Sequence, residues 1–283
     1  MSAGGQSRPL AILCGGGGFP LEVARAAEAN GQRPFLVGVV GSSDPAIEAF
    51  PHVWVHMGQI GKMFGALKAQ AIVDIAFVGA MNRPEFADLR FDWGALKRAP
   101  ELAQLFRGGD NRLLVGIAGI FEREGLRIVG AHEIAPQLLA PLGAVVGARA
   151  APAEAEADIA AGAALLAALS PFDAGQGAVI VNGRVVAIEA AEGTDEMLAR
   201  VADLKATRRL RMQGPHGVFV KAAKRGQDQR LDMPTVGSKT IEAARRAELR
   251  GIALAAGQVL IAEREAFLRA ADAAGLFVVG FPT

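Results

Sequence analysis

The stretch Leu10–Gly31, LAILCGGGGFPLEVARAAEANG, is typical of one repeating unit of an α/β fold. A short apolar run, Leu10–Leu13, leads into four glycines, and Leu21–Asn30 then shows helical spacing. Pro20 suits the first turn of that helix, because the N–H that proline lacks would be unpaired there. The pattern predicts a strand, a glycine loop and a helix, a geometry in which backbone N–H groups and the helix dipole can hold a phosphate.

The glycine loop does not complete a known nucleotide-binding signature. No Lys-Ser/Thr pair follows it, as a P-loop would require, and the next expected strand, Phe35–Val40, runs into Gly41-Ser42-Ser43-Asp44 without an obvious ribose-binding acid. The support for a dinucleotide site is therefore weak. A tight turn without a ligand is about equally well supported.

The alternation of strands and helices continues through the first half of the chain. We expect strands at Val53–Val55, Ile72–Val78 and Arg127–Ala131, and helices at Gly61–Gln70 and Asn111–Glu124. This order predicts an open, mainly parallel sheet covered by helices. In such a sheet, ligands bind beyond the carboxyl ends of the strands.

Two cations of this half are candidate ligands for an anion. Arg83 lies in the turn Gly79–Pro84 after an expected strand, at the same predicted edge as the glycine loop. Lys62 lies at a helix start, where a positive charge is unfavourable unless an anion is nearby. Asp110 follows two glycines and is expected to cap the next helix or, about equally, to belong to a site.

Composition limits the class of protein. The chain has 283 residues, 51% of them hydrophobic, which is enough for two domains with sizeable cores. Its 30 basic and 29 acidic residues give a net charge of +1, which does not favour a nucleic-acid partner. The single cysteine, Cys14, excludes an intramolecular disulfide. No signal peptide and no long uncharged apolar run are evident, so we expect a cytoplasmic protein.

A change in composition marks the expected domain boundary. Ala148–Ala168 is rich in alanine and contains Pro152, which predicts a linker that enters a helix. We therefore expect two α/β domains joined by a linker, an N-terminal domain at 1–148 and a C-terminal domain at 149–283. In the second, Asn182-Gly183 predicts a hairpin between two β-branched runs. Thr194 is expected to cap a helix that ends near Leu204.

The loop Lys221–Gly237, KAAKRGQDQRLDMPTVG, interleaves cations with carboxylates. Lysine and arginine there suit a phosphate, and the aspartates suit a divalent metal. The alternative interpretation is a solvated surface loop with salt bridges. Glu192 and Asp195 are further possible metal ligands, although Asp195, early in a helix, also stabilises the helix dipole.

The inventory of reactive side chains favours phosphoryl chemistry. The sequence shows no Ser/His/Asp or Cys/His arrangement, and four histidines without metal-ligand spacing make a zinc site improbable. Carboxylates and basic groups flanked by glycine loops favour hydrolysis or binding of a phosphorylated ligand with Mg²⁺ or Mn²⁺.

An ordered set of motifs, spread over nearly the whole chain, resembles the UDP-2,3-diacylglucosamine pyrophosphatases of the LpxI type. The first half contributes GGGGFP, Gly61-Lys62, Asn82-Arg83-Pro84 and Gly109-Asp110. The second half contributes the segments 173–177, 189–195 and 221–237. One departure is Arg225, where the family usually has proline after the second lysine.

The resemblance implies hydrolysis of the pyrophosphate bond of UDP-2,3-diacylglucosamine to UMP and 2,3-diacylglucosamine 1-phosphate (lipid X) in bacterial lipid A biosynthesis. It further implies Mg²⁺, with Mn²⁺ as an alternative, water attack on the sugar-side phosphorus, and a ligand cleft between the two domains. The expected partner is this lipid-linked nucleotide sugar, met in a transient contact at the cytoplasmic face of the inner membrane.

On this basis Asp232 is expected to bind the metal and organise the attacking water, with Asp228 as its partner and Glu192 and Asp195 as further metal candidates. The expected substrate and phosphate ligands are Gly15, Gly16, Gly17, Gly18, Lys62, Arg83, Lys221, Lys224, Gln227, Arg230 and Thr235. Two other functions remain open. They are a non-catalytic nucleotide-sugar or phospholipid sensor and, less well supported, a nicotinamide-dependent oxidoreductase.

Overall fold

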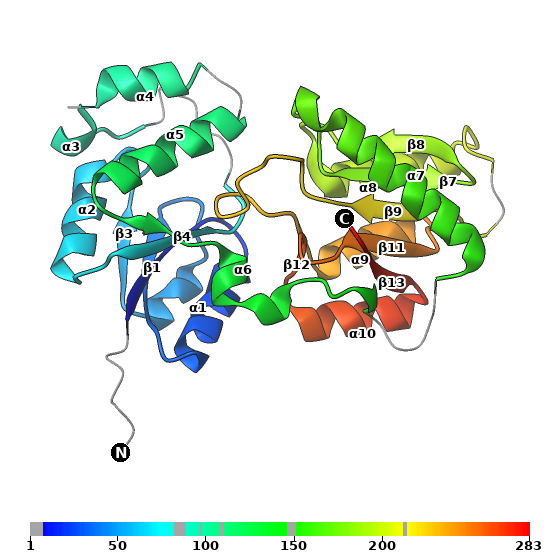
Figure 1. Cartoon of the computed structure of the whole chain (residues 1–283), viewed down its shortest axis with the longest axis horizontal. Coiled ribbons are helices and arrows are strands. Elements are labelled where there is room, and N and C mark those ends of the chain that lie inside the picture. Colours follow the sequence, from blue (N-terminus) through cyan, green and yellow to red (C-terminus); the bar gives the residue numbers. More distant parts are fainter. Residues whose placement is uncertain (1–7, 82–88, 97, 108–109, 146–150, 212–213) are drawn as a thin grey trace. The chain divides into compact units, whose positions relative to one another are not determined.

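The structure is a computed structural model that describes the chain except for residues 1–7, 82–88, 97, 108–109, 146–150 and 212–213. It divides into two compact units (Figure 1). Unit 1 comprises Met1–Pro136 together with Arg230–Asp232, and unit 2 comprises Gln137–Gln229 and Met233–Thr283. Both units are α/β, so the expected fold class is confirmed.

Unit 1 contains a five-stranded sheet whose paired strands all run parallel, in the order β3-β2-β1-β4-β5. Its strands are β1 (Pro9–Cys14), β2 (Arg33–Val39), β3 (His52–Val55), β4 (Asp74–Val78) and β5 (Arg127–Ile128). The last of these is shorter than expected, because a short helix begins at Ala131.

Helices cover both faces of this sheet. Ala11 and Leu13 of β1 belong to the apolar cluster that contains Leu67 and Phe121, whereas Leu10 and its neighbours of the same parity face the other way. The helices of unit 1 are α1 (Phe19–Ala29), η1 (Pro45–Ala49), α2 (Ile60–Ala69), α3 (Trp93–Leu96), α4 (Ala99–Leu105), α5 (Asp110–Arg123) and α6 (Ala131–Ile134).

Unit 2 contains a six-stranded mixed sheet in the order β6-β13-β11-β9-β7-β8. Its three central strands β9, β11 and β13 are parallel, and β6, β7 and β8 add antiparallel pairs at the two edges. The strands are β6 (Gly143–Ala144), β7 (Gly177–Val181), β8 (Arg184–Ile188), β9 (Val218–Lys221), β11 (Gly251–Ala255) and β13 (Phe277–Phe281), with a separate pair of β10 (Thr235–Val236) and β12 (Leu260–Ile261).

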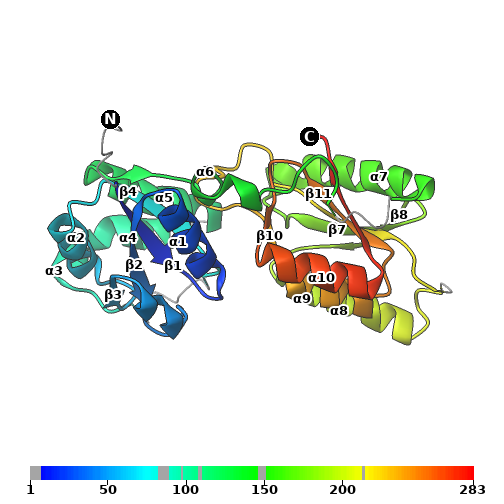
Figure 2. The same ribbon diagram turned by 90° about the horizontal axis from the view of Figure 1, so that it is seen from below.

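The sheet of unit 2 lies between two layers of helices. Figure 2 shows α7 on one face, and α8, α9 and α10 side by side on the other. The helices are η3 (Pro136–Leu138), α7 (Ala153–Leu169), η4 (Ser170–Phe172), α8 (Gly193–Ala206), α9 (Ser238–Arg246) and α10 (Arg264–Ala274). Helix α9 ends at Arg246, shortly before Glu248, which adopts a left-handed conformation with φ 49°.

The predicted hairpin is confirmed. Strands β7 and β8 pair antiparallel, and Asn182 and Gly183 between them have φ values of 52° and 75°. Two positive φ values are what a two-residue hairpin turn needs to match the strand twist. The buried carboxylate of Asp158, on α7, accepts both backbone N–H groups of this turn, at 3.0 and 2.6 Å.

The domain boundary lies earlier than the expected position between 148 and 149. The chain passes from unit 1 to unit 2 between Pro136 and Gln137. Residues after this point already bond within unit 2, since β6 pairs with β13 and the N–H of Ala140 donates to the carbonyl of Val259 at 2.8 Å. The change in composition marked the start of α7 rather than the boundary.

One segment, Ala153–Phe172, is long and apolar enough by composition to cross a membrane. In the structure its helix α7 packs on strands β7 and β9. A Cβ atom added to Gly162 would lie 2.6 Å from the side chain of Val220, so the helix and the sheet are in close contact. Together with the buried Asp158, this contact shows that one face of α7 packs on the sheet of unit 2, while 28% of the apolar window is buried.

Candidate functional site

The glycine loop of unit 1 follows β1 and is hydrogen-bonded to the carboxyl end of β4 and the residues after it. The N–H groups of Gly15 and Gly16 donate to the carbonyls of Val78 and Ala80, at 2.7 and 2.6 Å. These two donors are therefore occupied within the fold, and the assignment of Gly15 and Gly16 as phosphate ligands stays a prediction. Gly17 and Gly18 are exposed at the N-terminus of α1, and for them it stays a prediction as well.

Cys14 ends β1 directly before this loop and is fully buried. Burial, partly offset by a hydrogen bond from the backbone of Val37, raises the pKa of its thiol to about 12. The thiol is therefore protonated at neutral pH, which makes Cys14 a packing residue rather than a nucleophile.

A carboxylate of the chain itself lies at the start of α2, while the assignment of the Lys62 side chain as a phosphate ligand stays a prediction. The backbone N–H groups of Gly61 and Lys62, at the start of α2, donate to the carboxylate of Asp92 at 3.1 and 2.9 Å. The N–H of Ala95 in α3 donates to the same carboxylate at 3.0 Å. Burial alone would raise the pKa of Asp92, but these bonds and one from Gly94 lower it. The side chain of Lys62 is exposed.

Two residues singled out in the sequence fall outside the described part of the structure. Arg83 lies in the segment 82–88, so its assignment as a phosphate ligand stays a prediction. Asp110 is the first residue of α5, but its side chain is likewise outside the described residues. Whether it caps the helix therefore also stays a prediction.

In unit 2, Lys221 lies at the end of β9 and is buried, with 3% of its surface exposed. Its Nζ donates to Thr194 Oγ1 at 2.7 Å and lies 3.4 Å from Glu189 Oε2. The expected cap by Thr194 is wrong, because α8 begins at Gly193 and the threonine hydroxyl instead accepts from the lysine. Glu189 was not among the predicted site residues.

Lys224 and Gln227 are held by a second segment of unit 2. The Nζ of Lys224 contacts Asp173 Oδ1 at 2.6 Å, and the amide of Gln176 donates to Gln227 Oε1 at 2.8 Å. The backbone N–H of Lys224 also donates to this Gln227 oxygen, at 3.2 Å. The lysine is about one-fifth exposed, so its ammonium is within reach of a ligand.

Asp173 and Gln176 therefore contact two of the predicted ligands, although they were not predicted as ligands themselves. Their signal in the sequence was the motif at 173–177. Arg225, which stands where the family usually has proline, makes a bond of its own here. Its backbone N–H donates to Ser170 Oγ at 3.0 Å. Proline could not make this bond. The loop is thus fixed in this chain by a hydrogen bond rather than by a ring.

The next part of the loop belongs to unit 1, not to the C-terminal domain as expected. Arg230–Asp232 clusters with unit 1, and Leu231 is buried in the apolar core beneath the sheet. Arg230 lies 3.6 Å from Glu122 of α5. Asp232 is exposed, and Asp228, which clusters with unit 2, is half-buried.

The remaining metal candidates lie at the start of α8. Glu192 pairs with Arg200 at 2.6 Å, and a hydrogen bond from its own backbone N–H, followed by the arginine charge, lowers its pKa. Asp195 is exposed in the first helical turn. Across the described residues, no three His, Cys, Asp or Glu side chains converge on a common point. The assignment of metal ligands therefore stays a prediction.

Thr235, the last predicted ligand, lies in β10, and its hydroxyl donates to the carbonyl of Met233 at 3.1 Å. It was expected to contact the substrate. Its side chain is partly buried and bonded within its own segment.

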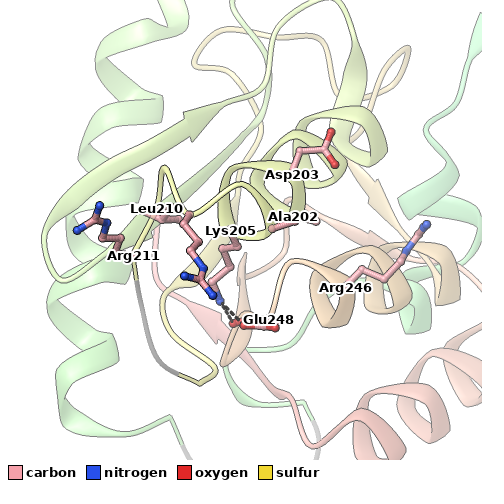
Figure 3. Close-up of a pocket in the computed structure, with 9 residues that line it drawn as sticks. Ala202, Asp203, Lys205, Leu210, Arg211, Arg246 and Glu248 are labelled. Atoms are coloured by element: carbon pink, nitrogen blue, oxygen red, sulfur yellow. Dashed lines mark hydrogen bonds and ion pairs between the residues drawn. The ribbon is translucent and has the colours of Figure 1, made fainter.

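A cavity of about 810 Å³ in unit 2 lies away from these residues (Figure 3). Its lining includes Lys205, which bonds Glu248 Oε2 at 3.0 Å, and exposed arginines such as Arg211 and Arg246. Lys205 is in the last turn of α8, whereas Thr194 beside Lys221 is in the first, roughly 16 Å away along the helix. Its lining, as far as the structure describes the chain, therefore contains none of the predicted ligands.

Comparisons with known proteins match both units. The model of the LpxI N-terminal domain matches residues 9–138, and the model of the LpxI C-terminal domain matches residues 143–279. The chain is 41% identical over 273 residues to the UDP-2,3-diacylglucosamine pyrophosphatase LpxI of Caulobacter vibrioides. This alignment covers 96% of the chain and 97% of that protein.

Proposed function

Because the chain belongs to the LpxI family, we propose that it hydrolyses the pyrophosphate bond of UDP-2,3-diacylglucosamine. The products are UMP and 2,3-diacylglucosamine 1-phosphate, in lipid A biosynthesis. The observation that carries the proposal is the identity of 41% over nearly the full length of both chains, to a relative named for this activity. The protein would work in the cytoplasm and meet its substrate at the membrane surface.

The chemistry of the cluster around Lys224 supports phosphate binding. The lysine is held at a defined position by Asp173 and through its backbone by Gln227. When a phosphate arrives, the ammonium can exchange its contact with Asp173 for the ligand oxygen. Lys221 would act indirectly. Its buried ammonium does not face solvent, so it would hold Glu189 and Thr194 in position rather than bind the phosphate itself.

The donor set fits Mg²⁺. Asp228 and Asp232 offer the hard carboxylate oxygens that this ion prefers, and Mg²⁺ is usually held by one or two carboxylates together with substrate phosphates. When bound, the ion would neutralise charge on the pyrophosphate.

In the proposed reaction Asp232 accepts a proton from a water molecule and orients the oxygen of that water toward the sugar-side phosphorus. The new P–O bond forms as the bond to the bridging oxygen breaks. UMP leaves with the bridging oxygen, and the water oxygen stays in the sugar 1-phosphate. Arg230 and Lys224 would hold the phosphate oxygens during the transfer.

The test is UMP release by purified protein from detergent-dispersed UDP-2,3-diacylglucosamine, with Mg²⁺ and with EDTA. We expect release only with Mg²⁺, and loss of turnover with retained substrate binding in Asp232→Asn. Lys224→Ala should mainly raise KM, because it removes a phosphate contact rather than the water activator. Substrate binding by folded wild-type protein without release would instead establish the sensor function.

A further inference from the structure

Unit 1 presents an aromatic side chain almost fully to solvent. Trp93, the first residue of α3, is 79% exposed, and Leu96 is 49% exposed. Residues three apart are neighbours on a helix surface, so these two form one outward apolar face. Ala95 between them is fully buried and faces inward. We call Trp93 and Leu96 the α3 face.

The helix that carries this face is firmly held. The carboxylate of Asp92 accepts N–H groups from the first turns of both α2 and α3. A Cβ atom added to Gly94 would lie 2.6 Å from the Cα atom of Gly61, so the two helices touch through their backbones. Ala95 belongs to a separate apolar cluster with Leu102. The fold therefore exposes Trp93 on a rigid support.

Basic side chains flank the α3 face. Arg90, just before α3, and Lys62, in the first turn of α2, are both exposed. In the segment 90–98, RFDWGALKR, the charge of Asp92 is engaged by backbone N–H groups and that of Arg98 by Glu124, so Arg90 is the exposed cation of this segment that the structure describes. Protein surfaces that bind at the interface of an anionic membrane typically combine tryptophan and leucine with neighbouring cations.

The α3 face also lies at the ligand edge of the sheet. The N–H of Arg90 donates to the carbonyl of Met57 at 2.8 Å, just beyond the carboxyl end of β3. The glycine loop that follows β1 and the start of α2 lie at this same edge. A membrane contact here would therefore be beside Lys62 and Gly17, which are predicted to hold the substrate phosphates.

We propose that the α3 face docks on the surface of an anionic phospholipid bilayer, with Trp93 at the level of the headgroups and Arg90 against the lipid phosphates. The proposal rests on the proposed function, because a diacylated substrate resides in such a surface. It adds how unit 1 meets that surface. Each exposed cation strengthens the contact with the anionic lipids electrostatically. The indole of Trp93 adds apolar area that becomes buried when it enters the headgroup layer.

The chain supplies its own probe for this contact. It has two tryptophans, Trp54 and Trp93, and no tyrosine. In Trp54→Phe, emission therefore comes from Trp93, and we expect it to move to shorter wavelength when phosphatidylglycerol vesicles are added. In the matched variant Trp93→Phe, emission from Trp54, which bonds Glu48 at 3.0 Å, should not move.

Sedimentation with the same vesicles measures the affinity. Trp93→Ala with Leu96→Ser should weaken vesicle binding at least about ten-fold, since an apolar side chain of this size gains that much on burial. The control is Val73→Ser, 57% exposed but placed before β4 at the opposite edge of the sheet. It should bind like the wild type, and binding should fall with salt.

Hydrolysis of substrate dispersed in detergent separates this proposal from the proposed function. The double variant should keep wild-type turnover there, because neither residue is part of the site. No emission shift with anionic vesicles, or equal vesicle affinity in the double variant, would overturn the proposal. A shift seen only with monomeric lipid substrate would also overturn it, since Trp93 would then contact the bound lipid. Failure of the wild type to hydrolyse would count against the proposed function alone.

Discussion

Asp92 shows how much one side chain can organise. Its carboxylate accepts N–H groups from the starts of two helices, α2 and α3. It also places a negative charge at the helix start that carries Lys62. The sequence revealed that an anion was needed at this helix start, but it could not reveal that the anion lies 30 residues further along the chain.

We expect Asp92→Ala to lower the free energy of unfolding by about 1–2 kcal/mol at pH 7, because a helix cap contributes about that much. The hydrogen bonds lower the pKa of Asp92 in the folded state. Its contribution is therefore present above the unfolded pKa of about 3.9 and is lost as pH falls through the lower folded value. Urea titrations of both proteins at pH 7 and pH 3 measure this, and an equal difference at the two pH values would contradict it.

Lys221 and Lys224 look equivalent in the sequence, yet burial separates their roles. Lys221, the last residue of β9, forms an ion pair with Glu189, and the two side chains are 4% and 11% exposed. Lys221→Met should destabilise the protein by about 3–5 kcal/mol, because it leaves a buried carboxylate without its partner. Lys221→Met with Glu189→Gln should recover part of that loss.

Lys224→Ala is the matched control for this pair, because its contact with Asp173 is more exposed. It should change thermal stability little, by about 1 kcal/mol at most. Thermal unfolding of the four proteins gives the comparison. A double variant no more stable than Lys221→Met alone would show that Glu189 and Lys221 do not depend on each other.

At the scale of elements, periodicity and turn chemistry were good guides where the segment forms its own structure. The hairpin at Asn182-Gly183 follows from local sequence, because β-branched runs and a two-residue turn specify it directly. Helix α3 was missed, since four residues carry no periodic signal and the helix depends on Asp92 and on contact with Gly61. Elements held by distant partners are not readable from spacing.

The hairpin tests the role of such a distant partner. Asp158 on α7 accepts the N–H groups of both turn residues and is 4% exposed. Asp158→Ala should cost about 1–3 kcal/mol, because it leaves two backbone donors without their acceptor. Hydrogen exchange should become faster at Asn182 and Gly183 than in the opposite edge strand β6. Unchanged exchange at the turn would show that the turn holds without the carboxylate.

At the scale of the whole molecule, the chain is not two consecutive blocks. Composition suggested one boundary, but the chain leaves unit 1 at Pro136 and three residues of the loop, Arg230–Asp232, cluster with it again. Leu231 holds this part of the loop on unit 1. Its side chain packs in the unit 1 core, and 9% of the residue's surface is exposed. The sequence could not show this, because one leucine in a charged loop has no periodic neighbours.

This topology predicts that a residue of the C-terminal half stabilises the N-terminal unit. Leu231→Ala removes buried apolar volume, so it should cost about 2–4 kcal/mol. In hydrogen exchange read by mass spectrometry, protection should fall in peptides from 9–136. The control Leu249→Ala, also in the C-terminal half and 2% exposed in the core of unit 2, should lower protection in peptides from 137–283 instead. If Leu231→Ala loosened only unit 2, the loop would belong there, and Asp232 would have to be assigned to unit 2 with Asp228. If the expected pattern is found, Leu231 anchors this part of the loop in unit 1, and the chain returns to unit 2 at Met233.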